Sequence, residues 1–346
     1  MSAVEERLDA VYAIGGGPGA NRVGYSLEED EAHRLVRGWM EEAGLEIEVD
    51  ADGNLFGRLR GSEPDLPEVW SGSHLDSVPH GGRFDGPLGV IGALEAVGRL
   101  GRRRRTLAVV AFREEERGCV GSRALVARGV GLPGFFVELH HEQGPRLALV
   151  GAPLAVVTSI VGYVRGERVV EGRAGHAGTT PMAVRDDALV SAAEEILRIR
   201  DVARSIDGAV ATVGSLEVEP GGINVIPGRV TFTIDARAPD AARLERLIRE
   251  LELDVSRTVP PTPLGVAPAD ALRAALESRG LPLVELASGA GHDAGVLARA
   301  GVPSAMVFVR AQNGGVSHSP DEHSTPEDVA LAIDVLTDAL DRLSSP

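Results

Sequence analysis

VWSGSHLDSVPHGGRFDGPLGVIGALEAVGRL, residues 69–100, is the stretch of the sequence that decides the fold. It begins with a short apolar strand at about 69–71 and ends in a run of small apolar residues, about 89–100, that is typical of a buried helix. A second apolar strand, TLAVVAF, follows at 106–112. A strand, a helix and a second strand at this spacing predict two parallel neighbours in an α/β sheet.

The segments on either side extend this α/β pattern. Residues 26–44 have apolar positions at helical spacing, with Ser26 as the predicted N-cap and Gly44 as the predicted stop. Residues 45–49 and 55–59 alternate around a turn and predict a β-hairpin. The alternation resumes in the last third of the chain, as helix, strand, helix, strand and helix at 269–279, 283–286, 294–300, 304–309 and 325–343.

A different pattern lies between these two regions. It runs strand, helix, strand, strand, helix, at 163–172, 181–200, 209–219, 229–237 and 240–251. This order predicts a small antiparallel sheet with helices, and the Pro-rich residues 259–263 predict a hinge out of it. We therefore expect one larger domain made of residues 1–160 and 263–346, interrupted by an inserted domain at 161–262.

Composition excludes several classes of partner. The 346 residues carry 35 Lys and Arg against 51 Asp and Glu, a net charge of −16. Such an acidic surface repels phosphate backbones and anionic lipids, so we expect no nucleic-acid or membrane partner. Cys119 is the only cysteine, and the acidic N-terminus does not resemble a signal peptide. A cytoplasmic location is the expectation.

Metal-ligand residues collect where strands are predicted to end. His74 and Asp76 follow the first strand, and Asp85 precedes the helix after it. Imidazole and carboxylate groups hold zinc-like ions, and Asp76 could hydrogen-bond the other ring nitrogen of His74 and fix its tautomer. A histidine satisfied within a turn would explain this pattern if it stood alone.

Three further clusters follow the other strands. Glu114, Glu115 and Glu116 come after the strand at 106–112; such crowded carboxylates repel one another unless cations neutralise them. The remaining two clusters are ELHHEQG at 138–144 and GVSHSPDEH at 315–323. A solvated acidic loop is the alternative for the glutamates. Four clusters at sheet edges favour a pair of metal ions over a single structural ion.

Taken together and in this order, the clusters resemble the di-metal aminoacylase and carboxypeptidase-type amidohydrolases. Within them the chain is similar to the branch of N-carbamoyl-L-amino-acid hydrolases, allantoate amidohydrolases and β-ureidopropionases. The stretches that carry the resemblance are GSHLDSVPHGGRFDGPLGV (72–90), ELHHEQGP (138–145), GRAGHAGTTPM (172–182), GGINVIPGRVTFTIDAR (221–237), SGAGHDA (288–294) and GVSHSPDE (315–322). The resemblance implies an α/β, metallopeptidase-like catalytic domain with a mixed central sheet, and an inserted α+β lid and dimerisation domain.

The resemblance also implies roles for individual residues. The implied metal ligands are His74, Asp85, Glu116, His140 and His318, with Asp85 bridging two ions. The implied catalytic residues are Glu115 as general base, with Asp76 and His176. The implied substrate-binding residues are Gln143, Asn224, Arg237 and His292, with Arg237 facing a substrate carboxylate.

The implied activity is metal-dependent hydrolysis of a linear ureido C–N bond in a small anionic substrate, with two divalent ions per subunit (Zn, Mn, Co or Ni) and a homodimer. An N-acyl-amino-acid deacylase or metallopeptidase is the enzymatic alternative, and a catalytically inactive binding or scaffold protein is the other. The segment after the glutamates departs from the branch's usual pattern, and three consecutive glutamates leave the register of base and ligand open by one residue. His80, His141 and His323 have no implied role.

Overall fold

The computed structural model describes residues 2–129 and 131–345, which form two compact units. Unit 1 takes the chain up to Thr158 and again from Pro263, and unit 2 is the segment Ser159–Thr262 between them. Each unit has its own buried apolar cluster. No helix in the described ranges combines the length and the apolar character needed to cross a bilayer.

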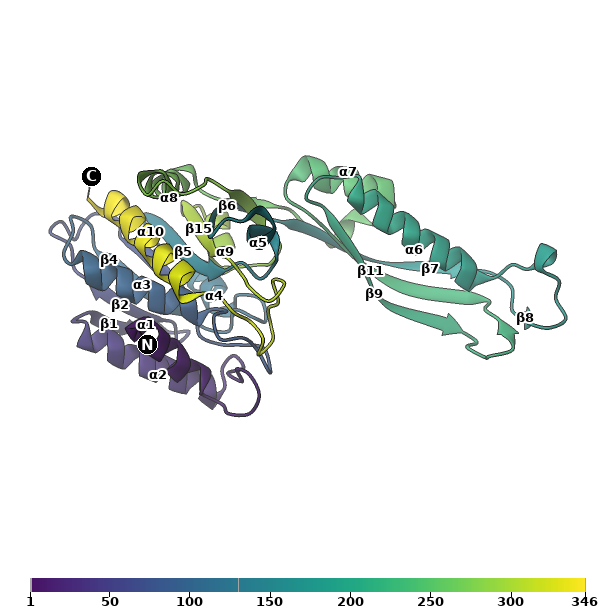
Figure 1. Ribbon diagram of the computed structural model, residues 1–346, viewed down its shortest axis with the longest axis horizontal. Coiled ribbons are helices and arrows are strands. Elements are labelled where there is room, and N and C mark those ends of the chain that lie inside the picture. The colour runs from purple at the N-terminus through teal and green to yellow at the C-terminus, as the bar shows by residue number, and fades with distance from the viewer. Residues whose placement is uncertain (1, 130, 346) are drawn as a thin grey trace. The chain divides into compact units, whose positions relative to one another are not determined.

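A mixed sheet is the centre of unit 1 (Figure 1). Its strands lie in the order β1-β2-β4-β3-β5-β15-β6-β13, and β14 also pairs with β6. β3 pairs in parallel with β4 and β5, and β5 pairs in parallel with β15. The pairs β1–β2, β2–β4 and β6–β15 are antiparallel. The strands are β1 (Glu46–Val49), β2 (Leu55–Leu59), β3 (Val69–His74), β4 (Leu107–Phe112), β5 (Phe135–His141), β6 (Leu154–Ile160), β13 (Thr262–Pro263), β14 (Glu285–Ser288) and β15 (Ser304–Val309).

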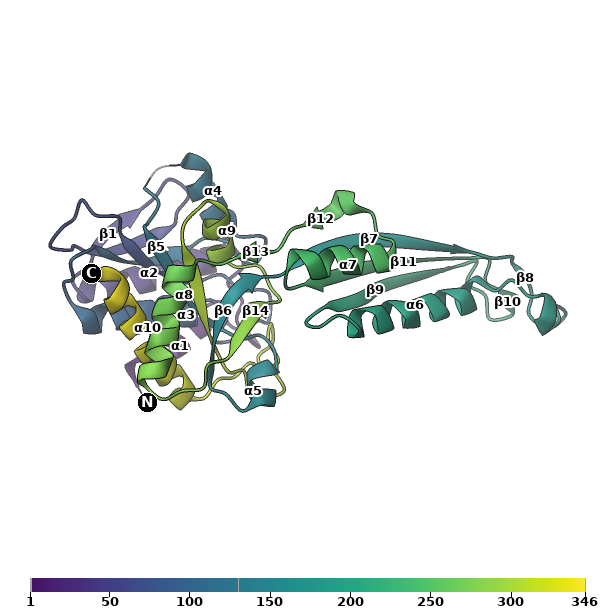
Figure 2. The same ribbon diagram turned by 90° about the horizontal axis from the view of Figure 1, so that it is seen from above.

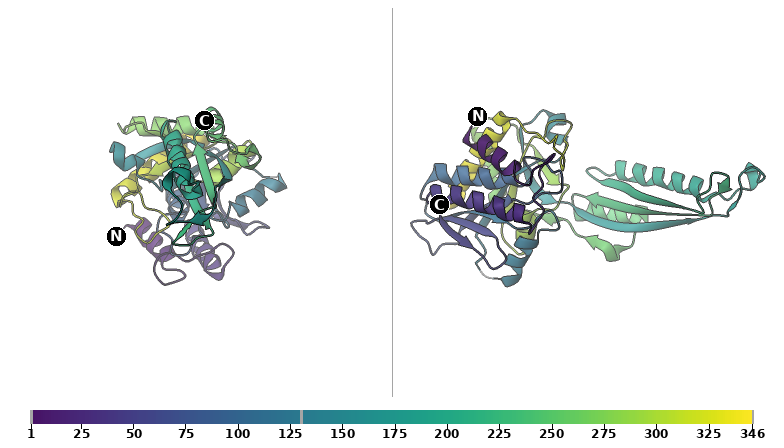
Figure 3. Two further views of the ribbon diagram at one scale, coloured as in Figure 1. Left: turned by 90° about the vertical axis from the view of Figure 1, so that its right-hand side faces the viewer. Right: turned by 90° about the horizontal axis from the view of Figure 1, so that it is seen from below.

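Helices cover the sheet of unit 1. α3 and α10 pack on each other and on the parallel strands, while α9 packs on β5 and β15. α1 packs on α3, and α2 packs on β1 and β2; both helices are drawn in purple in Figure 3. The helices of the unit are α1 (Ala3–Tyr12), α2 (Leu27–Glu42), α3 (Pro87–Leu100), α4 (Val120–Arg128), α5 (Arg146–Val150), α8 (Val266–Ser278), α9 (Asp293–Arg299) and α10 (Pro326–Ser344).

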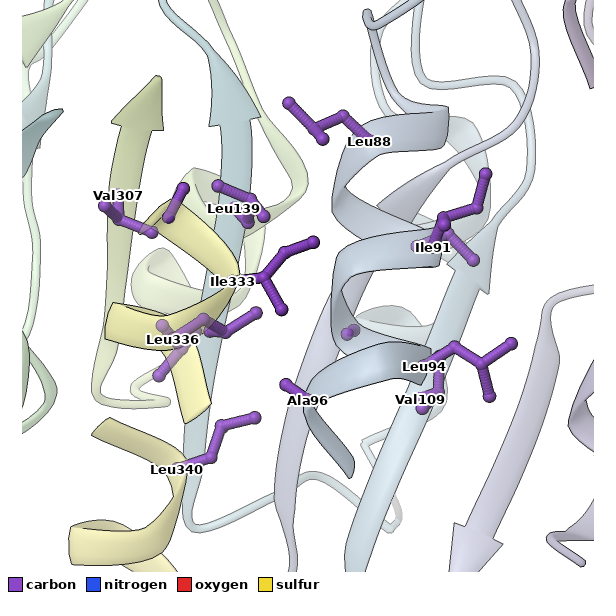
Figure 4. Packing of buried hydrophobic residues seen from close by; sticks show 14 of the residues in the cluster. Leu88, Ile91, Leu94, Ala96, Val109, Leu139, Val307, Ile333, Leu336 and Leu340 are labelled. Atoms are coloured by element: carbon purple, nitrogen blue, oxygen red, sulfur yellow. The ribbon is translucent and has the colours of Figure 1, made fainter. Parts of the chain in front are cut away.

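Burial on both faces explains the continuous apolar runs of the central strands. Every residue of β4 is buried, and its alternate residues point to opposite faces. Val109 on one face joins the cluster formed by Ile91 of α3 with Ile333 and Leu336 of α10 (Figure 4). Parallel strands enclosed in this way keep their carboxyl ends at one edge of the sheet, where loops can hold polar groups.

Unit 2 is an antiparallel sheet in the order β12-β7-β11-β9, with α6 and α7 packed on one face. The alternate β11 residues Val230, Phe232, Ile234 and Ala236 lie under these helices. A separate pair, β8 and β10, lies at one end of the unit (Figure 2). The elements are β7 (Gly162–Glu171), β8 (Gly175–His176), α6 (Ala188–Arg204), β9 (Val210–Glu219), β10 (Val225–Ile226), β11 (Arg229–Ala238), α7 (Ala241–Leu251) and β12 (Thr258–Val259).

The expected helix at 181–200 is wrong over its first residues. Met182–Val184 form a single 3-10 turn, and α6 begins at Ala188 after the N-cap Asp187, whose carboxylate accepts from the N–H groups of Leu189 and Val190. The carbonyl of Asp186 is occupied by the N–H of Arg173, so a tertiary hydrogen bond replaces the helical one. α4 and β6 were not predicted, because short segments of small residues have no clear period.

Candidate metal centre and active site

The parallel strands bring the polar clusters of unit 1 together at one sheet edge. His74 is the last residue of β3, His140 lies near the end of β5, and Glu116 lies in the loop after β4. Asp85 lies in the loop before α3, and His318 lies in the loop between β15 and α10. The five predicted metal ligands therefore come from separate segments and meet in one place.

These five residues form two donor groups that share Asp85. The first group is His74, Asp85 and His140, and the second is Asp85, Glu116 and His318; within each group the ligand atoms lie within 4.8 Å of one another. Asp85 Oδ1 lies 3.8 Å from His74 Nε2 and 3.4 Å from His140 Nε2. Asp85 Oδ2 lies 3.2 Å from His318 Nε2. Each carboxylate oxygen thus faces a different group, as a bridging ligand requires.

The tautomers of the two buried histidines suit a metal. His140 Nδ1 lies 2.9 Å from the carbonyl oxygen of His141, and His74 Nδ1 lies 3.2 Å from a carboxylate oxygen of Asp76. Because both partners are acceptors, each Nδ1 carries a proton, and in the neutral ring Nε2 keeps its lone pair. Both Nε2 atoms face Asp85.

The donor set fits divalent cations. His140 Nε2 is buried without a hydrogen-bond partner among the described residues, although it lies beside a carboxylate. Nitrogen and carboxylate donors with tautomers fixed by outer partners are the usual surroundings of zinc-like ions.

The charges at the site show the same demand for a cation. Hydrogen bonds with Asp85 and Glu116 raise the pKa of His318 to about 10. Burial by itself raises the pKa of Asp85, but the hydrogen bond from His318 and the nearby charge of His74 hold that pKa below its ordinary value. In the absence of a metal, protonated imidazole rings neutralise the charge of these carboxylates.

His74 and His140, the other two histidines among the predicted ligands, differ from each other in protonation. Burial by itself lowers the pKa of His74, but the charge of Glu115 and the hydrogen bond to Asp76 raise it well above its ordinary value. Burial lowers the pKa of His140 to about 4. His140 is therefore neutral at pH 7, whereas His74 and His318 must each lose a proton before they can bind an ion.

The three consecutive glutamates have separate environments. Glu116 Oε2 lies 3.3 Å from His318 Nε2, and Glu115 Oε2 lies 3.8 Å from His74 Nε2. Glu114 instead pairs with Arg117 at 3.0 Å and joins neither donor group. This geometry supports the register in which Glu116 is the ligand and Glu115 the base. Burial raises the pKa of Glu115 well above its ordinary value, which favours a carboxylate that accepts a proton.

The carboxylate of Asp76 hydrogen-bonds to several residues of the site. Asp76 is fully buried, and besides His74 its carboxylate accepts from the backbone N–H groups of Glu115 at 3.0 Å and Glu116 at 3.2 Å. One side chain therefore orients a predicted ligand and fixes the backbone that carries the predicted base. Asp76 was predicted as catalytic, and its contacts describe a positioning residue.

Two predicted substrate-binding residues lie beside the donor groups. Gln143 donates from Nε2 to Asp85 Oδ2 at 3.0 Å, and its Oε1 is buried without a partner among the described residues. His292 is 2 % exposed, and its ring packs edge-on against that of His140 with centroids 4.5 Å apart. His292 Nε2 lies 2.8 Å from the hydroxyl of Ser288, and burial lowers its pKa well below the ordinary value. Their roles toward substrate stay predictions.

The remaining predicted residues belong to unit 2. His176 in β8 is exposed and pairs in register with Val225 of β10, and the exposed Asn224 precedes this pair. His176 Nδ1 accepts from the N–H of Gly178 at 3.0 Å, so Nε2 carries the proton when the ring is neutral. Arg237 lies on β11 and pairs with Asp235 at 2.7 Å.

His80, His141 and His323 had no predicted role, and in the structure their rings contact groups outside the two donor groups. His80 Nδ1 lies 2.9 Å from the carbonyl oxygen of Pro18. His141 is fully buried and stacks on Phe84, whose ring also meets that of His323 edge-on.

The contacts and burial of several acids at the site were not predicted. Glu29 of α2 accepts from the N–H of Glu114 at 3.0 Å and pairs with Arg113 at 2.7 Å. A glutamate in the first turn of a helix is ordinary, so the sequence offered no signal for it. Glu138 and Asp293 are buried as well, and burial raises their pKa values to about 8 and about 7.

Glu138, His140 and His292 form a third possible donor group. Glu138 already accepts from the hydroxyl of Ser73 at 2.7 Å and from the N–H of Ala294 at 3.0 Å. With both carboxylate oxygens in use, this group is less suited to an ion than the two that share Asp85.

A mixed sheet with imidazole and carboxylate donors gathered at the ends of its parallel strands defines a metal-dependent hydrolase. Residues 70–342 match the model of Peptidase family M20/M25/M40, and the chain belongs to this family. The predicted fold class is confirmed.

Relatives narrow the class of enzyme. An N-carbamoyl-L-amino acid amidohydrolase of Geobacillus stearothermophilus is 38% identical, over 96% of this chain and 95% of the relative. The allantoate amidohydrolase of Escherichia coli K12 is 33% identical, over 96% of each chain. The crystal structure of an amidase of the hydantoinase/carbamoylase family from Burkholderia multivorans superposes with a TM-score of 0.91 at 31% identity, over 99% of this chain and 97% of that one. The chain is an amidohydrolase that acts on C–N bonds other than peptide bonds.

The protonation of His74 and His318 predicts proton release on metal binding. At pH 7.5 the metal-free protein should release at least one proton as Zn²⁺ or Mn²⁺ binds, because both rings must become neutral. Affinity should therefore rise with pH. Calorimetric titrations in buffers of different ionisation enthalpy measure the number of protons, and a binding enthalpy independent of the buffer would contradict the prediction.

Proposed function

We propose that this enzyme hydrolyses the ureido C–N bond of an N-carbamoyl amino acid or a related ureido acid and releases ammonia and CO₂. The observation that carries the proposal is Asp85, whose two oxygens face two different donor groups. The names of the relatives support the ureido bond as the target. Water attacks the ureido carbonyl, the bond to the terminal nitrogen breaks, and the carbamate that remains loses CO₂ to give the free amine.

We propose that the two donor groups hold two divalent ions, bridged by Asp85. Such ions would polarise the ureido carbonyl and lower the pKa of a water molecule. Borderline nitrogen and oxygen donors suit Zn²⁺, Mn²⁺, Co²⁺ or Ni²⁺. His74 and His140 belong to one group, Glu116 and His318 to the other.

Glu115 is the proposed general base. Its Oε2 is directed at His74, on the rim of the donor set, and its Oε1 lies 3.6 Å from the thiol of Cys119. A buried carboxylate with a raised pKa can accept a proton from the attacking water and return it to the departing ammonia. Asp76 fixes the position of Glu115 through the backbone N–H.

Arg237 is proposed to bind the substrate carboxylate, because a guanidinium fork matches a carboxylate with two parallel hydrogen bonds. Asn224 and His176 are proposed to contact the ureido end, where the exposed Nε2–H of His176 can donate to the carbonyl oxygen as negative charge develops on it. Unit 2 would then serve as the lid.

The positions of these residues within unit 2 support a homodimer. Arg237 pairs with Tyr163 at one end of β11, and His176 lies beyond the other end, where Arg229 pairs with Glu171. The eight residue-to-residue steps from Arg229 to Arg237 alone span about 26 Å at about 3.3 Å per step. A small ureido acid cannot touch both ends of one sheet. We infer that a second copy of the chain supplies His176 and Asn224, and that unit 2 mediates the association.

The sole cysteine, Cys119, excludes an intrachain disulfide, and we propose a cytoplasmic location on that ground.

The proposed reaction is tested by ammonia release. Metal-free protein is reloaded with Zn²⁺, Mn²⁺, Co²⁺ or Ni²⁺ and offered N-carbamoyl-L-amino acids, allantoate and 3-ureidopropionate. We expect metal-dependent ammonia release from at least one of them. If none of these substrates released ammonia and the protein hydrolysed N-acyl amino acids or dipeptides instead, the deacylase or peptidase alternative would hold.

Glu115→Gln should lower kcat by several orders of magnitude and leave the metal content unchanged, because the amide cannot accept the proton but has the same shape. Glu114→Gln is the matched control: its side chain pairs with Arg117, outside both donor groups, and its kcat should stay within a few-fold of wild type. Metal analysis and steady-state kinetics measure both. A Glu115→Gln enzyme with near-normal kcat would exclude Glu115 as the base.

Mixing two inactive variants tests the shared site. Arg237→Ala and His176→Ala should each abolish most activity alone. When the two are refolded or co-expressed together, half of the dimers are mixed, and each mixed dimer has one site with both residues intact. Activity on the order of a quarter of wild type should return. A mixture as inactive as its components would show that each site takes both residues from one chain.

A further inference from the structure

A buried carboxylate, Glu322, joins the loops that carry Asp85 and His318. Glu322 lies in the loop before α10 and is 4 % exposed. Its Oε1 accepts from the backbone N–H groups of Phe84 at 2.7 Å and Asp85 at 2.9 Å. Its Oε2 accepts from the hydroxyl of Ser317 at 2.7 Å. Asp85 is itself a predicted metal ligand, and Ser317 directly precedes the predicted ligand His318.

Two other groups close around the same carboxylate. His141, which follows the predicted ligand His140, has its Nδ1 3.8 Å from Glu322 Oε2. Gly82 lies so close that a Cβ on it would come within 2.2 Å of the Glu322 carboxyl carbon. A side chain at 82 would therefore displace the carboxylate, and the backbone before Asp85 can reach Glu322 only because residue 82 is glycine.

The energetics of burial make this contact a strong constraint. A carboxylate away from water is costly unless donors satisfy it, and hydrogen bonds to a charged acceptor are about twice as strong as neutral ones. Glu322 has donors on both oxygens, so moving either loop would leave an unsatisfied buried charge. His318 has a φ of 55°, a left-handed conformation that a histidine keeps only when its surroundings hold it.

We propose that Glu322 is a positioning residue that fixes the Asp85 loop relative to the His318 loop and so sets the geometry of the donor group Asp85, Glu116 and His318. This inference rests on the proposed two-ion site. Two of the three donors in this group depend on Glu322, against one in the other group, the shared Asp85. His74 and His140 are positioned by Asp76 and by the carbonyl of His141. Loss of Glu322 should therefore weaken one ion more than the other.

The test is a calorimetric titration of metal-stripped protein with Zn²⁺. Wild type should bind two ions. Glu322→Ala should bind one ion within a few-fold of the wild-type affinity and the other with a loss of about 10- to 100-fold, the usual effect of removing an outer partner of a metal ligand. Glu322→Gln should largely restore the second ion, because its amide oxygen can still accept from Phe84 and Asp85, and Ser317 can turn its hydroxyl to accept.

Asp328→Ala is the matched control. Asp328, in the first turn of α10, is also buried, but its carboxylate pairs with Arg310 at 2.8 Å instead of with the backbone of the Asp85 loop. It should lower the melting temperature without changing either affinity. If Glu322→Ala does not fold, Gly82→Ala displaces the carboxylate without removing it, and it should give the same selective loss.

The possible outcomes separate the positioning role of Glu322 from the proposed two-ion site. Equal affinities in wild type and the Glu322→Ala or Gly82→Ala variant would overturn the positioning role, and so would an equal loss at both sites. Wild-type protein that binds fewer than two ions would instead contradict the proposed function, independently of Glu322.

Discussion

Buried carboxylates crowded at one sheet edge are the constraint on which the rest of this structure depends. Asp76, Asp85, Glu115 and Glu322 are each less than a tenth exposed, and negative charges at such spacing repel unless donors and cations satisfy them. The structure meets this demand with backbone N–H groups, which Asp76 and Glu322 bind in pairs. The imidazoles of the donor groups, and the ions that would replace their protons, supply the rest.

The carboxylates at this sheet edge fall into two kinds, those that hold loops and those that are available as ligands. Asp76 and Glu322 have their oxygens occupied by fixed donors and so hold the loops, whereas Asp85 and Glu116 point at histidine nitrogens and remain available as ligands. Glu115 is held through its backbone, which leaves its carboxylate free for the proposed proton transfer. The helices that bury both faces of the parallel strands provide the rigid frame that such placement needs.

The sheet of unit 2 is less enclosed than the sheet of unit 1. It is covered by helices on one face only, and Arg237 lies on the alternate set of β11 residues that these helices leave open. If Arg237 and His176 both contact one small substrate, as proposed, their separation along β11 makes one chain insufficient. A symmetric dimer would then supply both residues to each site.

The sequence by itself predicted the fold class, an inserted domain and most strands and helices, because apolar periodicity is a local pattern. The ligand-type clusters at strand ends were visible in the same way, whereas the individual residues of the two donor groups came from the family resemblance. The sequence did not determine the start of α6, where a tertiary hydrogen bond competes with the helix, nor which of Glu114, Glu115 and Glu116 faces the histidines. The roles of Glu29 and Glu322 also came from the tertiary structure alone, since their partners lie 85 and 237 residues away in the chain. A hydrogen bond across such a distance leaves no periodic trace, and only folding brings its two ends together.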